Sequence, residues 1–543
     1  MQEPAVNGSG DAPAVERAPR WGKVIDQTRC IGCHACTTAC KSENLVPLSV
    51  TRTYVKHVDV GEYPQTRRAH QVTRCNQCTH APCTTACPTT AMFKRPDGIV
   101  DFDKSICIGC KACMAACPYD AIFINPEDHS AEKCNFCAHR IDMGLEPACV
   151  VVCPVEAILV GDMHDPASKV ARIVNRDPVN VRRPEKETQP KLFYKGAHQA
   201  TLDPLAARRP EGKLYMWSEQ RTGTDLVPSG HPDHNNTSAA ALLSYDIAHA
   251  IPWDWRVSLY TWTKGIAAGA YLVAALFVLL GVISPHAVSD VLGGYVSRPV
   301  LPAPDGYFSL SASPLWLWVA PVLSGAFLAL TGALLIWDLE HPERFYLIFT
   351  RPQWRSWLVR GAFIIAGYSL VLALHFGASL LGHTTPQRFL MIAGLPLAAL
   401  TAIYTAYLFA QAKARDMWQN PLLPPHLFVQ SLLAGACALL PFAAWLDPYA
   451  VRPLLWSLGA LSLIHLLFIW GETTIVHPTA HAHLAVREMT RGRYRAYFLV
   501  GIGLTLVGVF APWLGLAAVP LALAGLLLFE HAYVQAGQSV PLA

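Results

Sequence analysis

Sixteen of the seventeen cysteines in this 543-residue chain lie between residues 30 and 153, in four groups of four. The groups are Cys30, Cys33, Cys36 and Cys40; Cys75, Cys78, Cys83 and Cys87; Cys107, Cys110, Cys113 and Cys117; and Cys134, Cys137, Cys149 and Cys153. The first and third have the C-x2-C-x2-C-x3-C spacing that holds 4Fe–4S clusters. In this spacing three thiolates bind one cluster, and the fourth binds the other cluster of a pair. Sixteen thiolates therefore suit four 4Fe–4S clusters, with none left over.

Structural zinc is the alternative, because four cysteines also hold zinc. Zinc sites usually combine two C-x2-C pairs that are far apart, whereas the first and third groups place four cysteines within eleven residues. The second and fourth groups are looser, and there the count of sixteen favours clusters. Cys437 stands alone in an apolar run, where we expect a small buried side chain.

Residues 1–20 are polar and predict a disordered lead, without the apolar core of a secretory signal or paired arginines. A cysteine-rich segment without an export signal favours metal ligation over disulfides. The net charge of +4 and the lack of a basic patch with interleaved aromatics give no reason to expect a nucleic-acid partner.

The elements that must position the cysteines lie in residues 21–165, where the motif recurs four times. Such a repeat indicates an α+β domain of duplicated ferredoxin-like units. Residues 166–250 are polar and rich in Pro, Arg and Lys, which predicts an extended connector without a core of its own. Residues 251–543 are dominated by apolar side chains and predict an all-α membrane domain in a lipid bilayer.

Apolar runs indicate the spans of this membrane domain. They cover residues 260–284, 314–337, 357–381, 389–411, 426–446, 453–471 and 497–529. The first six suit one helix each. The last has about 33 residues and would be roughly 50 Å long as one helix, which is too long for one span. Because Pro512, Gly515 and Pro520 favour a hairpin there, we expect eight helices, with seven as the alternative.

The four motifs, with the long gap in the fourth, resemble the four-cluster electron-transfer subunit of molybdopterin oxidoreductases such as dimethyl-sulfoxide and polysulfide reductases. The resemblance covers residues 21–165 and implies that the outer motifs pair with each other, as do the inner ones. The implied ligand sets are Cys30, Cys33, Cys36 and Cys153; Cys134, Cys137, Cys149 and Cys40; Cys75, Cys78, Cys83 and Cys117; and Cys107, Cys110, Cys113 and Cys87. Some relatives replace a cysteine and keep a three-iron cluster, but this sequence has no such replacement. Lys41 follows the first motif where the other three have proline, as is usual in the family.

The membrane part resembles the NrfD-like anchor of polysulfide reductase over most of residues 255–540. The resemblance is carried by the segments WDLEHPERFYLIFTRPQWRSWLVRGAF, KGIAAGAYL and YVQAGQ. It implies eight helices, no haem and a quinone site near the iron–sulfur subunit, with menaquinone or ubiquinone as the substrate. In most relatives the two parts are separate chains, whereas here they are fused.

The histidines of the spans give an independent reason to expect no haem. A b-type haem between helices usually needs paired histidines deep in the bilayer. Only His375 and His465 fall well inside the runs, and alternating helices would place them at different depths. The tract HPTAHAH, from His477 to His483, is an alternative metal site, although its basic loop favours an ordinary surface.

Ionisable residues in spans are costly and mark candidate functional sites. Those near span ends are Lys264, Asp338, Glu472 and Glu530, and the polar residues Tyr404, Tyr407 and Gln411 would share their membrane face if eight helices alternate. A quinone needs hydrogen-bond donors, a proton route and an apolar slot, so this face is the predicted quinone site. The alternative for each charged residue alone is snorkelling to the interface.

Basic residues predict the orientation of the chain. Loops on the side of the termini carry nine, namely Arg344, Arg351, Arg355, Lys413, Arg415, Arg487, Arg491, Arg493 and Arg495. The other side carries three, Arg298, Arg388 and Arg452. The positive-inside rule therefore predicts a multi-pass protein of the bacterial inner membrane with a cytoplasmic iron–sulfur domain. Two alternatives stay open: some arginines could serve to dock that domain, and a twin-arginine partner could export it.

These features favour an electron-transfer and quinone-reacting subunit of an oxidoreductase complex, without a catalytic site for a small substrate. Its partner would be a molybdopterin subunit with molybdenum or tungsten. A cytoplasmic face favours sulfite oxidation, with polysulfide, thiosulfate or formate chemistry as alternatives. The other hypotheses are an energy-coupling NrfD-type module fed by cytochromes and a membrane-tethered ferredoxin without a quinone site.

Overall fold

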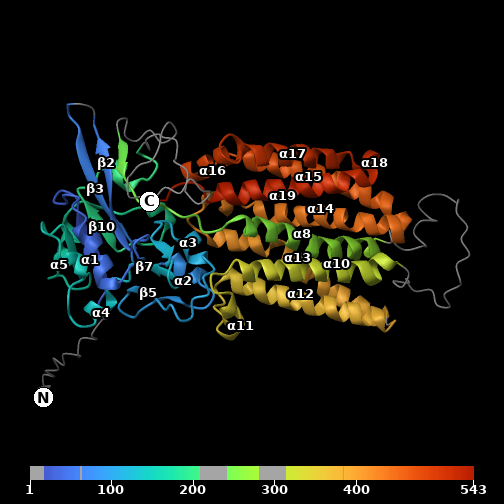
Figure 1. The fold of residues 1–543 in the computed structure, drawn as a ribbon, viewed down its shortest axis with the longest axis horizontal. Coiled ribbons are helices and arrows are strands. Elements are labelled where there is room, and N and C mark those ends of the chain that lie inside the picture. The colour runs from blue at the N-terminus through green and yellow to red at the C-terminus, as the bar shows by residue number, and fades with distance from the viewer. Residues whose placement is uncertain (1–17, 62–63, 208–240, 281–312, 383, 543) are drawn as a thin grey trace, which may run out of the picture.

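The computed structural model describes residues 18–61, 64–207, 241–280, 313–382 and 384–542. A cysteine-rich α+β domain forms one end of an elongated molecule, and a bundle of long helices extends from it (Figure 1). This order agrees with the predicted iron–sulfur domain followed by an all-α membrane domain. Of the predicted disordered lead, residues 1–17 lie outside the described part.

Two sheets frame the cysteine-rich domain. The first has the order β8 (Ile158–Asp162), β1 (Trp21–Asp26), β10 (Leu192–Lys195) and β9 (Val179–Asn180), with β10 parallel to β1. The second contains β11 (Leu242–Tyr245) and the long hairpin of β2 (Thr53–Val60) and β3 (Arg67–Arg74). Two small hairpins, β4 (Met92–Lys94) with β5 (Val100–Phe102) and β6 (Ile122–Ile124) with β7 (Ala131–Lys133), complete the strands. Short helices carry or follow the cysteines: α1 (Ala35–Asn44), α2 (Pro82–Ala86), α3 (Ala112–Ala116), α4 (Ala138–Ile141) and α5 (Ala148–Val151).

The structure differs from the predicted connector. Residues 166–207 form α6 (Lys169–Arg176), β9, β10 and α7 (Gln199–Leu202), and residues 242–245 form β11. The side chains of β10 alternate between buried and half-buried, as expected of a strand on a core. Because β10 pairs with β1 and β11 pairs with β2, each more than 130 residues earlier, no local pattern reveals these two pairings. The described parts of this segment therefore belong to the folded domain.

The bundle begins at Trp255. Its long helices are α8 (Trp255–Leu279), α10 (Ala320–Trp337, extended by a π-helical turn at Leu315–Val319), α12 (Trp357–Leu380), α13 (Thr384–Gln411), α14 (Leu423–Leu446), α15 (Pro448–Thr474), α17 (Arg495–Val509) and α19 (Ala518–Gly537). The short helices α11 (Leu347–Thr350), α16 (Ala480–Thr490) and α18 (Ala511–Leu514) connect them. Asp254 caps α8, since its carboxylate accepts a hydrogen bond from Arg256 N at 2.8 Å.

Seven helices of the described residues are long and apolar enough to cross a membrane, and the chain is a multi-pass membrane protein. The last predicted run forms a hairpin of α17 and α19 that turns at Phe510–Ala517, which contains Pro512 and Gly515, whereas Pro520 lies in the first turn of α19. Helix α17 has 15 residues, or about 22 Å, and makes an eighth, shorter apolar helix.

Two glycines fix the crossing of α8 and α14 in the core of the bundle. A Cβ atom on Gly269 would lie 1.7 Å from Ser431 O, and one on Gly435 would lie 2.0 Å from the carbonyl carbon of Gly269. The two backbones therefore touch, as small residues permit in membrane helices. This contact holds α8, the helix that carries Lys264, in the centre of the bundle.

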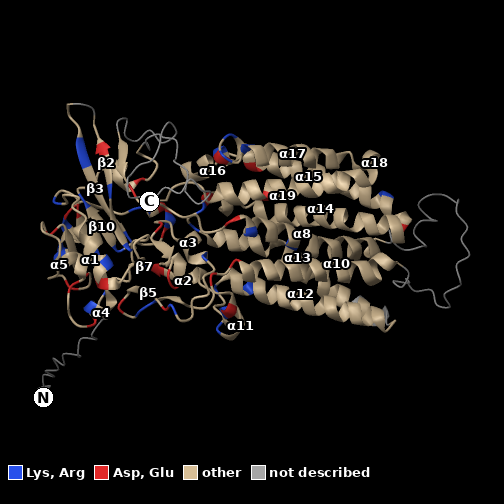
Figure 2. Cartoon of the chain, viewed as in Figure 1, with Lys and Arg blue, Asp and Glu red and all other residues tan. Residues whose placement is uncertain are grey.

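Charged residues are concentrated in the cysteine-rich domain and at its junction with the bundle, whereas the helices beyond are almost free of them (Figure 2). At this junction, the cysteine-rich domain contacts the ends of several bundle helices and the loops that connect them. Gln353 N donates to Pro88 O at 2.9 Å, and Ser356 Oγ donates to Ala86 O at 2.8 Å. The cysteine loops thus rest directly on the bundle.

Candidate functional site

Residues with a left-handed backbone conformation shape the cysteine loops. Gly32 and His34 have φ values of 70° and 58°, and Gly109 and Lys111 repeat this pattern at 68° and 60°. Each pair turns the chain tightly, so that successive cysteines face one point. A Cβ atom on Gly109 would lie 2.3 Å from the Cβ of Glu340, so this glycine also permits the loop to press on the bundle.

Two groups of four cysteines each line a cavity. Cys87, Cys107, Cys110 and Cys113 line one, and Cys75, Cys78, Cys83 and Cys117 line the other. Each group takes three residues from one motif and the fourth from another, as the family resemblance implies. Four soft thiolates around an enclosed space are the donor set that an iron–sulfur cluster requires.

The outer motifs also meet. Cys30 lies within electrostatic range of Cys153, and Cys40 lies within range of Cys134 and Cys137. The amide of Asn44 approaches both Cys40 Sγ, at 3.7 Å, and Cys137 Sγ, at 3.8 Å. These contacts join the same motifs that the resemblance pairs.

The four sets follow one another toward the bundle. Cys36 interacts with Cys149, Cys75 with Cys134, and Cys113 with Cys83, so each set adjoins the next. At the end of the row, Cys110 lies within electrostatic range of Asp338, which follows α10. Helices α4 and α5 lie at the far end of the domain and α2 and α3 lie next to the bundle (Figure 1). The sets therefore form a continuous row from the far end to the membrane part.

Buried cations and N–H groups surround the sulfurs. The buried Arg74 places Nη1 2.9 Å from Cys149 Sγ, and Lys23 Nζ lies 3.9 Å from the same atom. Burial raises the pKa of Cys149, but Arg74 and Lys23 outweigh it, so this pKa falls below its ordinary value. Met92 N donates to Cys87 Sγ at 3.3 Å. This surrounding stabilises anionic sulfur and fits a thiolate-bound cluster.

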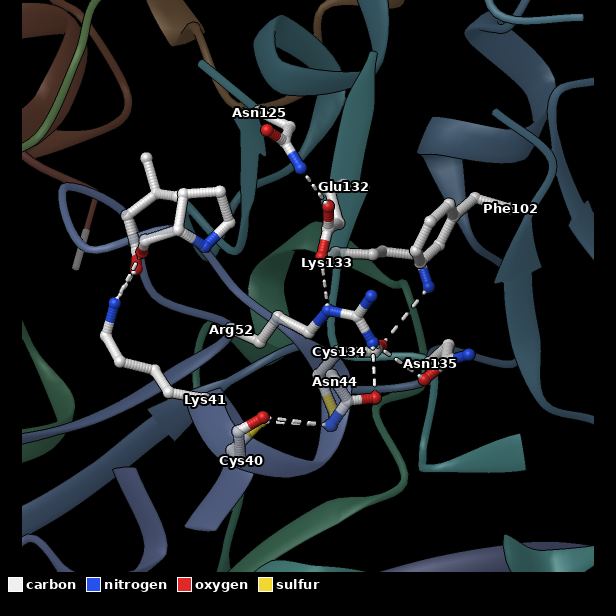
Figure 3. Close-up of polar contacts among 12 residues, drawn as sticks. Cys40, Lys41, Asn44, Arg52, Phe102, Asn125, Glu132, Lys133, Cys134 and Asn135 are labelled. Carbon is white, nitrogen blue, oxygen red and sulfur yellow. Dashed lines mark hydrogen bonds and ion pairs between the residues drawn. The ribbon is translucent and has the colours of Figure 1, made fainter. Parts of the chain in front are cut away.

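A second layer of polar contacts fixes the cysteine-bearing segments (Figure 3). Arg52 donates to Glu132 at 2.6 Å, to Asn44 at 2.7 Å and to Asn135 at 3.2 Å. The first of these contacts is a buried ion pair. Lys41 donates to the carbonyls of Pro47 and Val50, both at 2.6 Å. A proline at residue 41 could not fix the following loop in this way.

The row of cysteines ends on a charged junction. Lys111 Nζ lies 2.9 Å from Glu340 Oε1 and 3.8 Å from Asp338 Oδ1, and Arg256 lies 3.6 Å from the same oxygen. Trp253 Nε1 donates to Cys110 O at 3.2 Å. Burial raises the pKa of Asp338 to about 6, although Lys111 and Arg256 oppose this. A carboxyl group with this pKa can exchange protons near neutral pH.

Lys264 lies at the centre of a polar group inside the bundle. Its ammonium donates to Thr405 Oγ1 at 2.6 Å and to Ala402 O at 3.0 Å, and it lies 4.9 Å from the ring centroid of Tyr404. Glu530 accepts from Thr261 Oγ1 at 2.9 Å and lies within electrostatic range of Lys264. We call Lys264, Thr405, Tyr404, Glu530 and Thr261 the Lys264 group. The lysine stands nine residues after the start of α8, about 14 Å into the bundle from the junction.

Tyr260 connects the Lys264 group with the junction. Its buried hydroxyl lies within electrostatic range of Tyr404, Glu530 and Asp338. Sequence reasoning missed Tyr260, Thr261 and Thr405, because short or neutral side chains in an apolar run carry no signal that separates them from core residues.

Three predicted quinone-site residues lie apart from this group. Tyr407 is 38% exposed and stacks on Trp357, with ring centroids 4.5 Å apart. Gln411 accepts from Trp357 N at 3.0 Å and donates to Arg355 O at 2.9 Å, so it holds a loop. Glu472 is buried on α15 beside His426. The structure therefore places these three residues away from the Lys264 group, and the membrane side that the sequence predicts for them does not decide which helix each side chain faces.

A second buried polar group joins α14 and α15. His426 Nδ1 lies 3.0 Å from Glu472 Oε1, and His426 Nε2 lies 2.7 Å from His465 Nδ1. His375 lies elsewhere, against Tyr271 and Trp316. His426 stands four residues into its helix and was not singled out in the sequence, since nothing local pairs it with α15. We call His426, Glu472 and His465 the His426 group.

Family models agree with this division of the chain. Residues 21–42 match a 4Fe-4S binding domain, residues 69–163 match a 4Fe-4S dicluster domain, and residues 310–527 match the family described as "Polysulphide reductase, NrfD". The first part of the protein therefore binds iron–sulfur clusters, and the second part is an NrfD-type membrane domain.

Several curated relatives match the iron–sulfur part of the chain. The B subunit of tetrathionate reductase from Salmonella typhimurium is 42% identical over 208 residues, which are 37% of this sequence and 80% of the relative. The B subunit of polysulfide reductase from Wolinella succinogenes is 41% identical over 179 residues, which are 32% of this sequence and 94% of the relative. Protein NrfC of Escherichia coli (strain K12) is 40% identical over 177 residues, or 32% and 79% of the two sequences.

Proposed function

Because the protein belongs to the family of iron–sulfur B subunits of reductase complexes, here joined to an NrfD domain, we propose that it passes electrons between a catalytic partner and membrane quinone. One observation carries the proposal: the row of cysteine sets ends at Cys110, against the bundle end that contains Asp338 and the Lys264 group. A ferredoxin store without a quinone site would not need buried polar residues at that end.

The first part would hold four 4Fe–4S clusters, one in each cysteine set, as sixteen cysteines in four groups support. When bound, such clusters supply one-electron transfer. The protein contributes the order of the sets, the buried cations Lys23 and Arg74 and the N–H groups that face sulfur. No haem is part of the proposal. His426 and His465 hydrogen-bond directly to each other in this structure.

Arg74 should raise the reduction potential of the cluster that is bound by the set containing Cys149. Its replacement by glutamine removes a buried positive charge and should lower the reduction potential of that centre. A charge about 7 Å away, at an effective dielectric constant of about 20, shifts a one-electron potential by roughly 100 mV. A redox titration followed by EPR should show the largest shift in this centre, a smaller shift in the centre of Cys30 and Cys36, which also lie within electrostatic range of Arg74, and nearly unchanged potentials in the other two. Arg29→Gln is the control, because Arg29 pairs with Glu156 at the surface; equal shifts in both variants would contradict the assignment.

The quinone head group would lie between the Lys264 group and the junction. Lys264 and Tyr404 would supply the positive charge and the hydroxyl that stabilise the reduced oxygen. Tyr260 lies within electrostatic range of both Tyr404 and Asp338 and would link this position with Asp338, which would take up or release the proton at the junction.

Asp338 should set a pH dependence. With a pKa of about 6, its carboxylate accepts a proton above pH 6 and cannot do so below it. The rate at which quinol reduces the iron–sulfur centres should therefore rise between pH 5 and pH 7. Asp338→Asn should flatten this rise, whereas Glu340→Gln, in the same junction, should preserve it. A profile that is unchanged in Asp338→Asn would contradict the role of Asp338.

Basic residues support a cytoplasmic position of the cluster domain in a bacterial inner membrane. Two of the nine arginines and lysines on that side serve the fold: Arg344 donates to Lys104 O and Cys107 O, and Arg415 donates to Gln538 O. Without these two, seven basic residues still stand against three on the other side.

The catalytic partner would be a molybdopterin subunit, and its substrate a sulfur compound such as sulfite. The names of two relatives, a tetrathionate and a polysulfide reductase, support sulfur chemistry. Anaerobic purification of the native complex tests this proposal. Molybdenum or tungsten in a co-purifying subunit is the expected result. A multihaem cytochrome in its place would contradict it.

The His426 group favours a second candidate function, an energy-coupling module fed by cytochromes. Glu472, His426 and His465 form a hydrogen-bonded series inside the bundle, and such series can conduct protons. Phe529, on the neighbouring helix α19, packs against the imidazoles of both His426 and His465. The next residue of α19, Glu530, belongs to the Lys264 group. Proton uptake by vesicles that contain the complex during quinol oxidation would favour this candidate.

A further inference from the structure

Three buried aromatic rings pack together at the junction of the cysteine-rich domain with the bundle. Trp253 stands two residues before α8, Phe409 lies near the end of α13, and Trp418 lies in the 3-10 turn that follows α13. The ring centroids of Trp253 and Trp418 are 5.5 Å apart and those of Trp418 and Phe409 are 4.6 Å apart, and both pairs are stacked. We call these three residues the Trp253 stack.

One end of the Trp253 stack contacts the last cysteine set. The indole Nε1 of Trp253 donates to Cys110 O at 3.2 Å. Cys110 also packs against the group of buried side chains to which Trp253 and Phe409 belong. A single hydrogen bond therefore joins the indole ring to a residue whose thiolate is a proposed cluster ligand.

The other end of the Trp253 stack leads to the Lys264 group. Phe409 follows Thr405 by four residues on α13, so the two side chains lie on one face of this helix, one turn apart. Thr405 Oγ1 in turn accepts from Lys264 Nζ at 2.6 Å. The three rings thus join Cys110 to the residues that are proposed to bind quinone.

The rings are held in fixed positions. The backbone N of Trp253 donates to Gln538 Oε1 at 3.1 Å, and its carbonyl accepts from the side-chain amides of Gln538 and Gln535. A Cβ atom on Gly537 would lie 2.0 Å from Trp418 Nε1, so α19 presses on the second ring. Trp253, Trp418 and Phe409 are 5%, 0% and 2% exposed. Such close packing excludes water and keeps the distances between the rings constant.

We propose that the Trp253 stack provides the electronic coupling between quinol and the cluster of the set that contains Cys110. This inference rests on the proposed reaction with quinone. Oxidation of one quinol to quinone releases two electrons and two protons. The electrons would tunnel one at a time past the rings and the hydrogen bond to Cys110 O, and then pass along the other sets to the catalytic partner. The rings themselves are neither oxidised nor reduced.

The protons would take a different route, through the hydroxyl of Tyr260 and the carboxyl group of Asp338. Electron tunnelling weakens less steeply across stacked rings and hydrogen bonds than across an empty gap, whereas proton transfer needs groups that can accept and donate a proton. The Trp253 stack lacks such groups apart from its indole N–H, so it suits electrons and not protons.

The variant Trp253→Phe tests the proposal, because phenylalanine keeps an aromatic ring and cannot donate to Cys110 O. Stopped-flow spectroscopy of the full-length protein in nanodiscs measures cluster reduction over a range of quinol concentrations. The rate at saturating quinol should fall several-fold, and the quinol concentration that gives half of this rate should stay the same. Phe409→Leu should act in the same way from the other end of the stack. Trp255→Phe is the control and should react as the unmodified protein does, because Trp255 is 49% exposed and contacts Trp337 edge-on.

A redox titration followed by EPR gives a second readout. A coupling role predicts that the midpoint potentials and the iron content of both variants equal those of the unmodified protein. If one variant loses iron, the other variant decides. Unchanged saturating rates would overturn the proposal. A slow rate that accompanies a shifted potential or a higher half-saturating quinol concentration would also overturn it, since the stack would then shape the cluster or the quinone site. These outcomes differ from failure of the proposed function, in which quinol does not reduce the clusters of the unmodified protein.

Discussion

Replacing Lys264 with methionine should slow the reduction of the iron–sulfur centres by quinol about 100-fold, the usual cost of removing one electrostatic donor from an active site. Lys264 is 1% exposed, and its Nζ donates to Thr405 Oγ1 and to Ala402 O, so this group is held in one position in the bundle. Methionine keeps most of the side-chain length and loses the charge and the donors. Stopped-flow spectroscopy of the full-length protein in nanodiscs measures the rate.

Lys413→Met is the matched control, because Lys413 is an exposed lysine at the same end of the bundle. Its rate should equal that of the unmodified protein. The iron content and melting temperature of Lys264→Met must also be unchanged for the comparison to hold, and Tyr404→Phe provides a second variant of the same group if they are not. A rate within a factor of two of the unmodified protein in both Lys264→Met and Tyr404→Phe would remove the Lys264 group from the quinone site.

Replacing Cys110 with serine should reduce electron transfer from quinol to background. Cys110 belongs to the set that adjoins the bundle, and its carbonyl accepts from Trp253. Without the cluster of this set, the other three clusters would have no neighbouring cluster at the membrane end of the row. The iron content should fall from about sixteen to about twelve atoms per protein, since each set is proposed to hold four irons.

Cys437→Ala is the control for this prediction. Cys437 is completely buried in the bundle and belongs to none of the four sets. Its removal should leave the iron content and the quinol reaction unchanged. Rapid quinol reduction of the remaining centres in Cys110→Ser would contradict the proposed order of the sets.

Local spacing could predict which cysteines of one motif act together, because a C-x2-C-x2-C-x3-C loop is short and its geometry depends on few other residues. Contacts such as Cys40 with Cys134 join motifs about 90 residues apart, and only the family resemblance predicted them. The strands β10 and β11 were missed for a related reason. Each is a short strand whose partner lies far away in the sequence.

In the bundle, the depth of a residue along its helix could be predicted from the sequence, but the neighbouring helix that its side chain faces could not. The rise of 1.5 Å per residue places Lys264, Tyr404 and Glu472 in the half nearest the cluster domain. Which neighbour each one faces depends on how the helices cross, for example at the contact of Gly269 with Gly435. Lys264 and Tyr404 meet, whereas Glu472 faces His426 on another side of α19.

The central claim, that the row of cysteine sets exchanges electrons with quinone, is tested most directly by EPR spectroscopy of the intact protein. The purified protein is oxidised, treated anaerobically with excess menaquinol or ubiquinol, and frozen. In samples frozen within a few half-lives of the unmodified reaction, the account predicts signals of reduced iron–sulfur clusters in the unmodified protein and in Lys413→Met, and much weaker signals in Lys264→Met. Clusters that dithionite reduces, but that remain oxidised with either quinol in the unmodified protein, would contradict it.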